Sequence, residues 1–263
     1  MSYKTATNCK CRRYFHYVIE NVTERDKVNA IQMSWPNPKL LHSVIEQRFI
    51  AATGSLGTPE DVWTRFFTPV VEGLDTKDYL TSRIIPRPRD IIYWCNAALN
   101  NASDNRHTII EQEDILLAEE EYSQYATESL LSELIARVPN AEAFLYNFIR
   151  ASKILTYNQV RKFARTAKIP EEQIPGVIEL LTDTSFLGQE VRPETFAFNL
   201  EEGRKRAIQA QARNTAKQVK QVRFLINVPY HAFLEIREAD TSISTAKKIP
   251  TSTKSRTQSR RSR

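Results

Sequence analysis

The chain has 263 residues, 41% of them hydrophobic, and can therefore bury one or two compact cores. No run approaches the roughly 20 apolar residues of a membrane span. The basic residues near the start are followed by no continuous apolar stretch, which argues against a signal peptide. We expect a cytoplasmic protein that has no contact with a membrane.

The net charge of +6 belongs to the C-terminal end of the chain. Residues 240–263 contain seven basic residues and one acidic residue, whereas residues 1–239 contain equal numbers of both. A Ser/Thr/Arg/Lys segment of this kind has almost nothing to bury, which predicts a disordered basic tail over 239–263. Such a tail can touch nucleic acid nonspecifically, or it can be solvated without a dedicated partner.

The N-terminal segment, residues 1–30, shows no helical or strand period that supports an assignment. Cys9, Cys11 and His16 supply at most half of a zinc site, and the other ligands of a closed site are not apparent. We therefore predict no metal. The cysteines, Cys95 included, are odd in number and wrongly spaced for a disulfide framework.

Prolines mark the expected starts of three helices. Pro38 begins an amphipathic helix that runs past Arg48, Pro59 begins a short one, and Pro88 stands at the entrance of a third. Proline suits the first helical turn because its missing N–H would have no partner there. Before these helices, residues 28–35 alternate enough to predict a buried strand.

The segment Pro86-Arg87-Pro88-Arg89-Asp90 leads into an apolar stretch. Apolar residues then recur at helical spacing, so one face should be buried: Ile91, Ile92, Cys95, Ala98, Leu99 and Ala102. Asp90 would complement the helix dipole in the first turn. Arg87 and Arg89 can present guanidinium groups to a phosphate or carboxylate, or they can be two solvated arginines at a helix start.

A second long helical period follows a polar loop. Thr108 and Glu111 fit a capping box, although a start at Ile110 also satisfies the pattern. The period continues to Pro139 as one helix, or as two with a break near Ser123. The acidic run 119–121 is expected to be its solvated face.

Shorter elements follow residue 141. We expect a first helix around Phe144, a second capped by Thr156, a third over 170–181 and an alternating strand over 195–200. Three short helices followed by a β ribbon is the order of a winged helix. A polar stretch that can form a helix, a final strand and a closing helical turn complete the pattern over residues 201–223, 224–228 and 230–236.

The sequence lacks the common catalytic motifs. None of the six glycines is followed by Lys, so there is no G-x-x-x-x-G-K-[ST] phosphate loop. The histidines lack metal-ligand spacing and no nucleophile elbow occurs. His42 is expected at the surface and His231 packed and hydrogen-bonded. We expect no catalytic residues in this chain and no ATP hydrolysis by the chain alone.

From about Ile31 to Ile236, the order of motifs resembles the C-terminal half of bacterial P-loop ATPases of the STAND and origin-recognition AAA+ kind. Residues 31–35 resemble the last strand of the nucleotide-binding core, and residues 38–48 the helix after it. In those ATPases, the position of Arg87-Pro88-Arg89-Asp90 carries the lid residues that sense nucleotide. The resemblance implies that Arg89 reaches the γ-phosphate, that Arg87 is the second choice, and that Pro88 lies near the adenine.

The same resemblance implies a mainly α fold with four parts. They are an N-terminal segment (1–30), the end of an ATPase core with a helical lid-type bundle (31–138), a winged-helix domain with a small β ribbon and a C-terminal strand (139–238), and the basic tail (239–263). Counterparts of Walker A and Walker B are missing, so the chain resembles a truncated or split ATPase. ATP binding would then need a complementary subunit or a missing N-terminal half.

Two functions follow from these patterns. The first is a regulatory lid plus winged helix that acts through an ATPase core subunit, another protein or DNA. The alternative is a DNA-binding winged-helix regulator with an unrelated helical N-terminal domain; a gene fragment with an unstable product is a third possibility. The predicted recognition helix over 170–181 has acidic residues and no Lys or Arg, which favours a protein partner. The helix before it carries four basic candidates for DNA or partner contact: Arg161, Lys162, Arg165 and Lys168.

Overall fold

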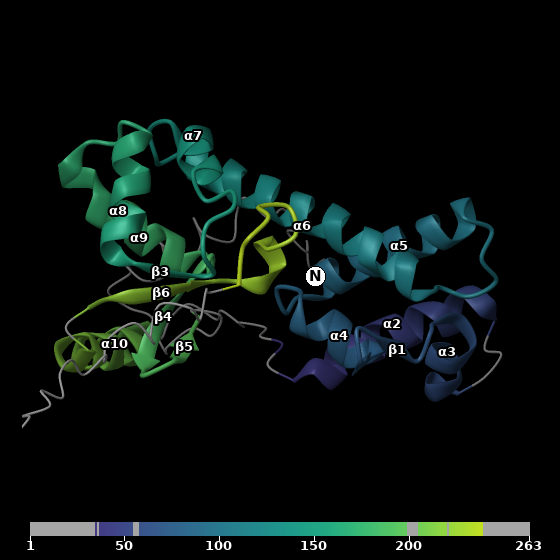
Figure 1. Cartoon of the computed structure of the whole chain (residues 1–263). Coiled ribbons are helices and arrows are strands. Elements are labelled where there is room, and N and C mark those ends of the chain that lie inside the picture. The colour runs from purple at the N-terminus through teal and green to yellow at the C-terminus, as the bar shows by residue number, and fades with distance from the viewer. Residues whose placement is uncertain (1–34, 36, 55–57, 199–204, 220, 239–263) are drawn as a thin grey trace, which may run out of the picture. The chain divides into compact units, whose positions relative to one another are not determined.

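The computed structural model describes residues 35, 37–54, 58–198, 205–219 and 221–238. The chain divides after Trp35, and every described element belongs to the part that begins at Pro36. The fold is mainly helical with a small antiparallel β part, which confirms the predicted class (Figure 1). Three predicted features lie outside the described residues. They are residues 28–34 of the expected first strand, the candidate metal ligands Cys9, Cys11 and His16, and the basic tail over 239–263.

The three helices with proline starts form where the sequence predicted them. The first half of the described chain consists of α2 (Pro38–Thr53), α3 (Pro59–Phe66), β1 (Val70–Val71), β2 (Leu74–Asp75), α4 (Thr76–Ser82), α5 (Pro88–Asp104) and α6 (Gln112–Ile135). Each of α2, α3 and α5 has a proline at its first or second position. The strands β1 and β2 form a short antiparallel hairpin. None of the described helices is both long and apolar enough to cross a membrane.

The helix α6 is continuous and packs against α5. No break occurs at Ser123, which is buried in the middle of the helix. Large aromatic side chains fill the contact: Trp94 of α5 and Tyr122 of α6 are fully buried and stack with ring centroids 5.3 Å apart. The burial of this face is the reason the helix persists through Ser123.

The start of α6 corrects the predicted cap at Thr108. Glu111 and Asp114 form the capping box instead, and the Glu111 N–H donates to Oδ2 of Asp114 over 2.9 Å. Ile110 does not begin the helix because its carbonyl accepts the N–H of Thr68 over 2.8 Å, while its own N–H donates to the carbonyl of Phe66 over 2.7 Å. This pairing holds the residue in an extended conformation and moves the helix start to Gln112.

The second half contains short helices and a four-stranded sheet. Its elements are α7 (Ala141–Tyr146), β3 (Ile154–Thr156), α8 (Tyr157–Thr166), the 3₁₀ turn η2 (Glu171–Gln173), α9 (Ile174–Asp183), β4 (Leu187–Arg192), β5 (Thr195–Ala197), α10 (Lys205–Val219), β6 (Arg223–Ile226) and the 3₁₀ turn η3 (Val228–Tyr230). Thr156 caps α8 as predicted.

The helix predicted over 170–181 is divided and shifted. Residues 171–173 form the 3₁₀ turn η2, and the α-helix begins at Ile174 and ends at Asp183. Pro175 explains the division, because it has no N–H to donate to the carbonyl four residues earlier. The strand expected over 195–200 is shorter as well: β5 ends at Ala197.

The last strand of the chain lies inside the sheet. The order is β3-β6-β4-β5 with antiparallel pairing throughout, so β6 separates β3 from β4. The register places Leu155 of β3 opposite Phe224 of β6, and Gly188 of β4 opposite Leu225. The helix α10 is inserted between β5 and β6 and packs on β4.

An aromatic cluster forms the core beneath these elements. Phe148 is fully buried, and its ring centroid lies 5.0 Å from that of Phe163 and 5.1 Å from that of Phe186. Tyr230, which follows β6, extends the cluster with its ring centroid 4.9 Å from that of Phe186. These edge-to-face contacts join the α7–α8 region to the end of the chain's last strand.

Candidate functional site

The predicted nucleotide-sensing residues lie at the N-terminal end of α5. Arg87 is the N-cap residue of this helix, Pro88 is its first residue, and Arg89 and Asp90 follow in the first turn. The sequence therefore predicted the local setting of these residues correctly. A helix N-terminus favours negative charge, so the position suits both the Asp90 carboxylate and an external anion.

Asp90 is buried, and both arginines lie beside it. Its exposed fraction is 1%, and Nε of Arg87 and Nε of Arg89 lie 3.5 and 3.9 Å from its Oδ2 atom. Within the described part of the chain, Oδ2 accepts no hydrogen bond. Burial raises the pKa of the Asp90 carboxyl, although the nearby Arg87 and Arg89 act in the opposite direction. Asp90 is thus a buried carboxyl group with two cationic side chains beside it.

Tyr122 of α6 completes this arrangement from a distant part of the sequence. Its hydroxyl donates to Oδ1 of Asp90 over 3.1 Å and accepts the N–H of Ile85 over 2.9 Å. Burial raises the pKa of Tyr122 well above its ordinary value, so the hydroxyl keeps its proton. The loop before α5 is therefore fixed to α6 by a hydrogen-bonded chain.

Two further tyrosines lie next to Arg89. The rings of Tyr93 and Tyr125 stack with centroids 4.2 Å apart and an interplanar angle of 13°. The guanidinium carbon of Arg89 lies 5.9 Å from the centre of the Tyr125 ring, within cation–π range. Sequence reasoning did not include these tyrosines in the site. The available signal was the three-residue spacing of Tyr122 and Tyr125, which places them on neighbouring parts of one helix face.

A third arginine, Arg83, pairs with a residue of α6. The guanidinium carbon of Arg83 lies 3.9 Å from the centre of the Tyr79 ring, and its Nε lies 3.2 Å from Oε1 of Glu119. The Tyr79 hydroxyl donates to the other carboxylate oxygen of Glu119 over 2.5 Å. Glu119 was expected on a solvated face; the structure places it in this polar contact instead.

The described residues place two partly exposed arginine side chains beside a buried carboxyl group. The side chains of Arg87 and Arg89 remain 31% and 40% exposed beside the buried carboxylate. No three of the described His, Cys, Asp and Glu residues are grouped so that they could hold a metal. His231 is hydrogen-bonded as expected, with Nε2 2.9 Å from the carbonyl oxygen of Ile226, and burial lowers its pKa.

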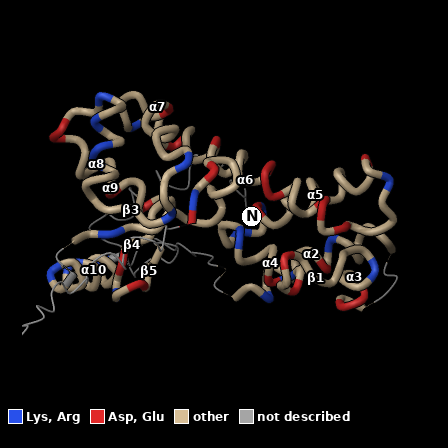
Figure 2. The backbone as a smooth tube through the Cα atoms, in the orientation of Figure 1, with Lys and Arg blue, Asp and Glu red and all other residues tan. Residues whose placement is uncertain are grey.

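The four basic candidates of the second half lie on or just after α8, away in sequence from the arginines of α5 (Figure 2). Arg161 and Arg165 both form ion pairs with Glu171 of η2, and the distance from Nε of Arg165 to Oε2 of Glu171 is 2.7 Å. These pairs lower the pKa of Glu171. Lys162 and Lys168 are exposed.

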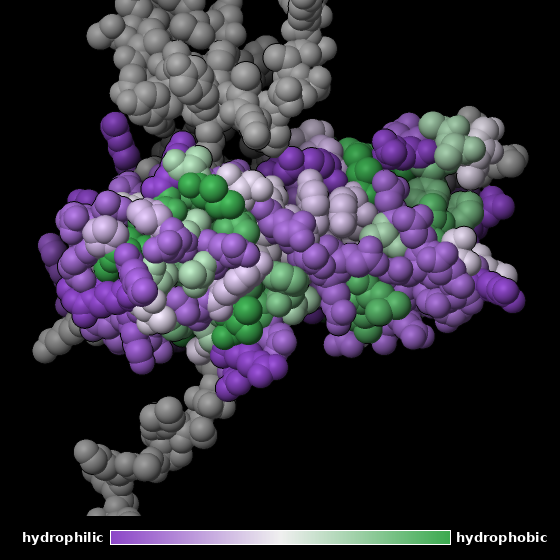
Figure 3. Space-filling view, turned by 90° about the horizontal axis from the view of Figure 1, so that it is seen from above, coloured by the Kyte–Doolittle hydropathy of each residue, from purple (hydrophilic) through white to green (hydrophobic). Residues whose placement is uncertain are grey.

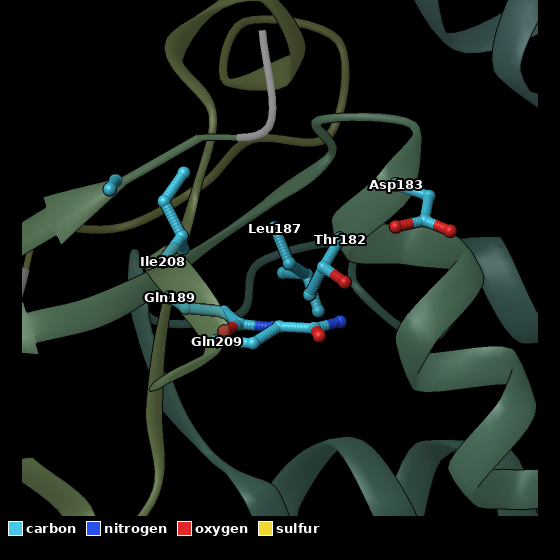
Figure 4. A pocket seen from close by; sticks show the side chains of 7 residues that line it. Thr182, Asp183, Leu187, Gln189, Ile208 and Gln209 are labelled. Atoms are coloured by element: carbon cyan, nitrogen blue, oxygen red, sulfur yellow. The ribbon is translucent and has the colours of Figure 1, made fainter. Parts of the chain in front are cut away.

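The face shown in Figure 3 is mostly hydrophilic, and its hydrophobic residues lie in separate areas. The described residues also form an open groove beside α9 and a small cavity. The groove has a volume of about 570 Å³, and acidic side chains on its wall are Glu172, Glu179 and Asp183. The cavity lies between α9, β4 and α10, where Gln189 and Gln209 lie near one another (Figure 4). Its volume of about 10 Å³ is close to the space of one water molecule.

Comparison with known proteins gives one match. Residues 39–131 are similar to a family described as the FunZ-associated C-terminal helical domain. The matched range runs from α2 into α6 and contains Arg87, Arg89 and Tyr122. No curated protein and no solved structure matches the chain. The chain thus contains a region similar to a helical-domain family, and the ATPase-lid and winged-helix assignments stay predictions.

Proposed function

We propose that this chain is a regulatory module of a nucleotide-dependent protein and works with a P-loop nucleotide-binding part supplied by another segment or polypeptide. In this proposal Arg89, with Arg87 beside it, contacts the γ-phosphate of ATP bound to that part. The chain alone does not hydrolyse ATP. The observation that carries the proposal is the pair of partly exposed guanidinium groups beside buried Asp90 at the start of α5.

The geometry suits phosphate recognition for an electrostatic reason. A guanidinium group has five N–H donors, so an arginine whose Nε faces a carboxylate can still direct other donors to a phosphate. Asp90 and Tyr122 hold the start of α5 in place, and fixed charges stabilise a transition state better than mobile ones. The stacked pair Tyr93–Tyr125 adds an aromatic surface near Arg89.

The family match is compatible with this division of labour. Its description names a helical domain that is C-terminal and associated with FunZ. A domain of that kind works beside another part, as a lid does beside a nucleotide-binding core. The match covers residues 39–131, the region that carries both arginines.

The second half is proposed to be a winged-helix domain that contacts a protein through α9. Its elements α7, β3, α8, α9 and β4–β5 follow the order of a winged helix. The helix α9 contains no Lys or Arg, and Glu171 before it forms ion pairs with two arginines of α8. Within α8 and its following turn, the alternative of a DNA-binding winged-helix regulator is favoured by the exposed Lys162 and Lys168.

The test begins with the DNA upstream of the codon for Met1. The proposal expects a neighbouring reading frame that encodes G-x-x-x-x-G-K-[ST]. The encoded protein and this chain are co-expressed, and ATP turnover by the purified complex is measured. Arg89→Ala should lower kcat by about 100-fold, as the loss of one transition-state donor does, and Arg87→Ala by less. Arg48→Ala, which removes an exposed arginine of α2, should leave kcat unchanged.

Two results would contradict the proposal. The first is a complex whose turnover is unaffected by both arginine substitutions. The second is saturable binding of a fluorescent ATP analogue by this chain alone, abolished by Arg89→Ala. That result would mean that the chain contains a complete nucleotide site.

A further inference from the structure

The helix α10 lies in a stretch of the chain that is strongly basic and contains no acidic residue. Residues 204–223 include seven basic residues: Arg204, Lys205, Arg206, Arg213, Lys217, Lys220 and Arg223. Within α10, the side chains of Arg206, Arg213 and Lys217 are exposed. Figure 2 shows the basic segments of this helix. The proposed nucleotide contact does not use them.

These three residues form one row on the helix. They are separated by seven and four positions, so at 3.6 residues per turn they lie within about 40° of one another and span about 16 Å. The opposite face is held against the sheet: Thr215 is buried, and its hydroxyl donates to the carbonyl of Val191 over 2.7 Å. The packing of α10 on β4 therefore fixes the row toward solvent.

The charges of the row are not neutralised within the described part of the chain. Arg206, Arg213 and Lys217 form no ion pair with a described residue, whereas Arg223 nearby pairs with both Glu190 and Glu194. Three like charges on one face are therefore available to an external anion.

The neighbours of the row indicate which anion. The exposed positions beside the three charges are short or polar: Ala210 and Asn214 lie within about 80° of Arg206 around the helix axis. Such a face has no large apolar side chain to enter a lipid interface or to hold a peptide helix. Arg, Lys, Gln and Asn are the side chains that contact phosphate and sugar in protein–DNA complexes.

We propose that the row Arg206–Arg213–Lys217 of α10 binds the phosphate backbone of duplex DNA without sequence preference. Measured along the duplex axis, a span of about 16 Å corresponds to four or five base-pair steps of about 3.4 Å each. The contact comes from the helix inserted between β5 and β6 and not from acidic α9. It is independent of Arg87 and Arg89, so either proposal can fail without the other.

The test measures binding of the full chain to a fluorescein-labelled 20-base-pair duplex by anisotropy at several KCl concentrations. The test variant is Arg206→Gln, Arg213→Gln, Lys217→Gln. The matched control removes the same charge from the tail: Arg256→Gln, Arg260→Gln, Arg261→Gln. Thermal unfolding of each variant checks that the fold is intact. We expect the α10 variant to lose at least about tenfold in affinity and the slope of log K against log salt to fall by about 3.

The proposal is wrong if the α10 variant loses less affinity for the duplex than the tail variant does, because the tail would then account for binding. It is also wrong if the natural chain does not bind the duplex at 50 mM KCl. Vesicles that contain phosphatidylserine provide a final comparison. The proposal also fails if the α10 variant loses vesicle binding but keeps its affinity for the duplex.

Discussion

The backbone N–H of Phe233 donates a hydrogen bond to Oγ of Ser123 over 2.9 Å. The donor lies in the segment after η3, and the acceptor lies in the middle of α6, 110 positions earlier in the chain. This bond joins the segment after η3 to α6, in which the neighbouring residue Tyr122 donates a hydrogen bond to Asp90. The arginine site and the segment after η3 are thus linked through two adjacent residues of α6.

Substitution of Ser123 tests this link. Ser123→Ala leaves the partly buried N–H of Phe233 without its partner and should lower the free energy of unfolding by about 1–2 kcal/mol. The control is Ser132→Ala on the same helix, where the hydroxyl is exposed and donates only to the carbonyl of Glu128. Urea unfolding should show a change below about 0.5 kcal/mol for the control. Equal effects would mean that the bond to Phe233 adds no stability.

Asp90→Asn should not destabilise the protein at pH 7, despite the two nearby arginines. The raised pKa of Asp90 means that folding disfavours its charged form. Its favourable contribution is present below the unfolded pKa of about 4 and is lost as pH rises through the folded pKa. The amide can still accept the Tyr122 hydroxyl, and the arginines are partly exposed. At pH 7 we expect equal or up to about 1 kcal/mol higher stability, a gap that closes near pH 4.

Asp114→Asn should change the stability at pH 7 in the opposite direction to Asp90→Asn. Burial raises the pKa of Asp114, but hydrogen bonds from His107, Asn105 and the Glu111 N–H outweigh it and leave the pKa lowered. Its contribution is present above the unfolded pKa and is lost as pH falls through the folded pKa. At pH 7 the substitution should cost about 1–3 kcal/mol by urea unfolding. A neutral result would contradict the capping role.

His107, which contacts Asp114 at the start of α6, should make the stability depend on pH in a second range. The hydrogen bond to Asp114, over 2.9 Å, raises the pKa of His107. The stabilisation is therefore complete below the unfolded pKa of about 6.5 and is lost as pH rises through the folded value. In His107→Gln this loss should be absent from the melting temperature measured between pH 6 and 9. A variant whose melting temperature keeps the natural pH profile would contradict the assignment.

Glu190 is expected to be important for the sheet. It is 3% exposed in β4 and accepts hydrogen bonds from two nitrogens of Arg223 in β6, with Nε 2.9 Å from Oε2. Glu190→Ala should cost about 2–4 kcal/mol because the half-buried guanidinium loses its principal partner. Glu194→Ala removes an exposed contact to the same guanidinium and should cost less than about 1 kcal/mol. Chemical unfolding of both variants separates the two roles.

The sequence predicted the starts of most helices correctly, but it did not predict the contacts between distant segments. Pro38, Pro59, Pro88 and Thr156 act through their own backbone or an adjacent turn, so the sequence shows their effect directly. Both starts considered after Thr108 were wrong, because the helix begins at Gln112 with Glu111 as its N-cap. The helix start is set by Ile110, whose backbone pairs with Phe66 and Thr68 at the end of α3. A pattern within the local sequence cannot show this pairing.

The sequence predicted the part of the candidate site that comes from residues 87–90, and it missed the part that comes from α6. The order Arg87-Pro88-Arg89-Asp90 correctly predicted a helix entrance with two arginines and a carboxylate in the first turn. It did not reveal that Asp90 would be buried, because that depends on Tyr122 of a different helix. The inserted position of β6 was hidden for the same reason, since strand order is a property of the assembled sheet.

The place of β6 also sets an order of events during synthesis. Strand β3 ends at Thr156, but the strand that pairs with it begins at Arg223. A ribosome must therefore release α8, α9, β4, β5 and α10 before β3 finds its neighbour, and until then both facing strand edges have unpaired backbone groups. The contacts of α5 with α6 need no such wait, whereas the bond from Phe233 to Ser123 of α6 does. Completion of the sheet is a step of high contact order, so we expect it late in the folding of the protein.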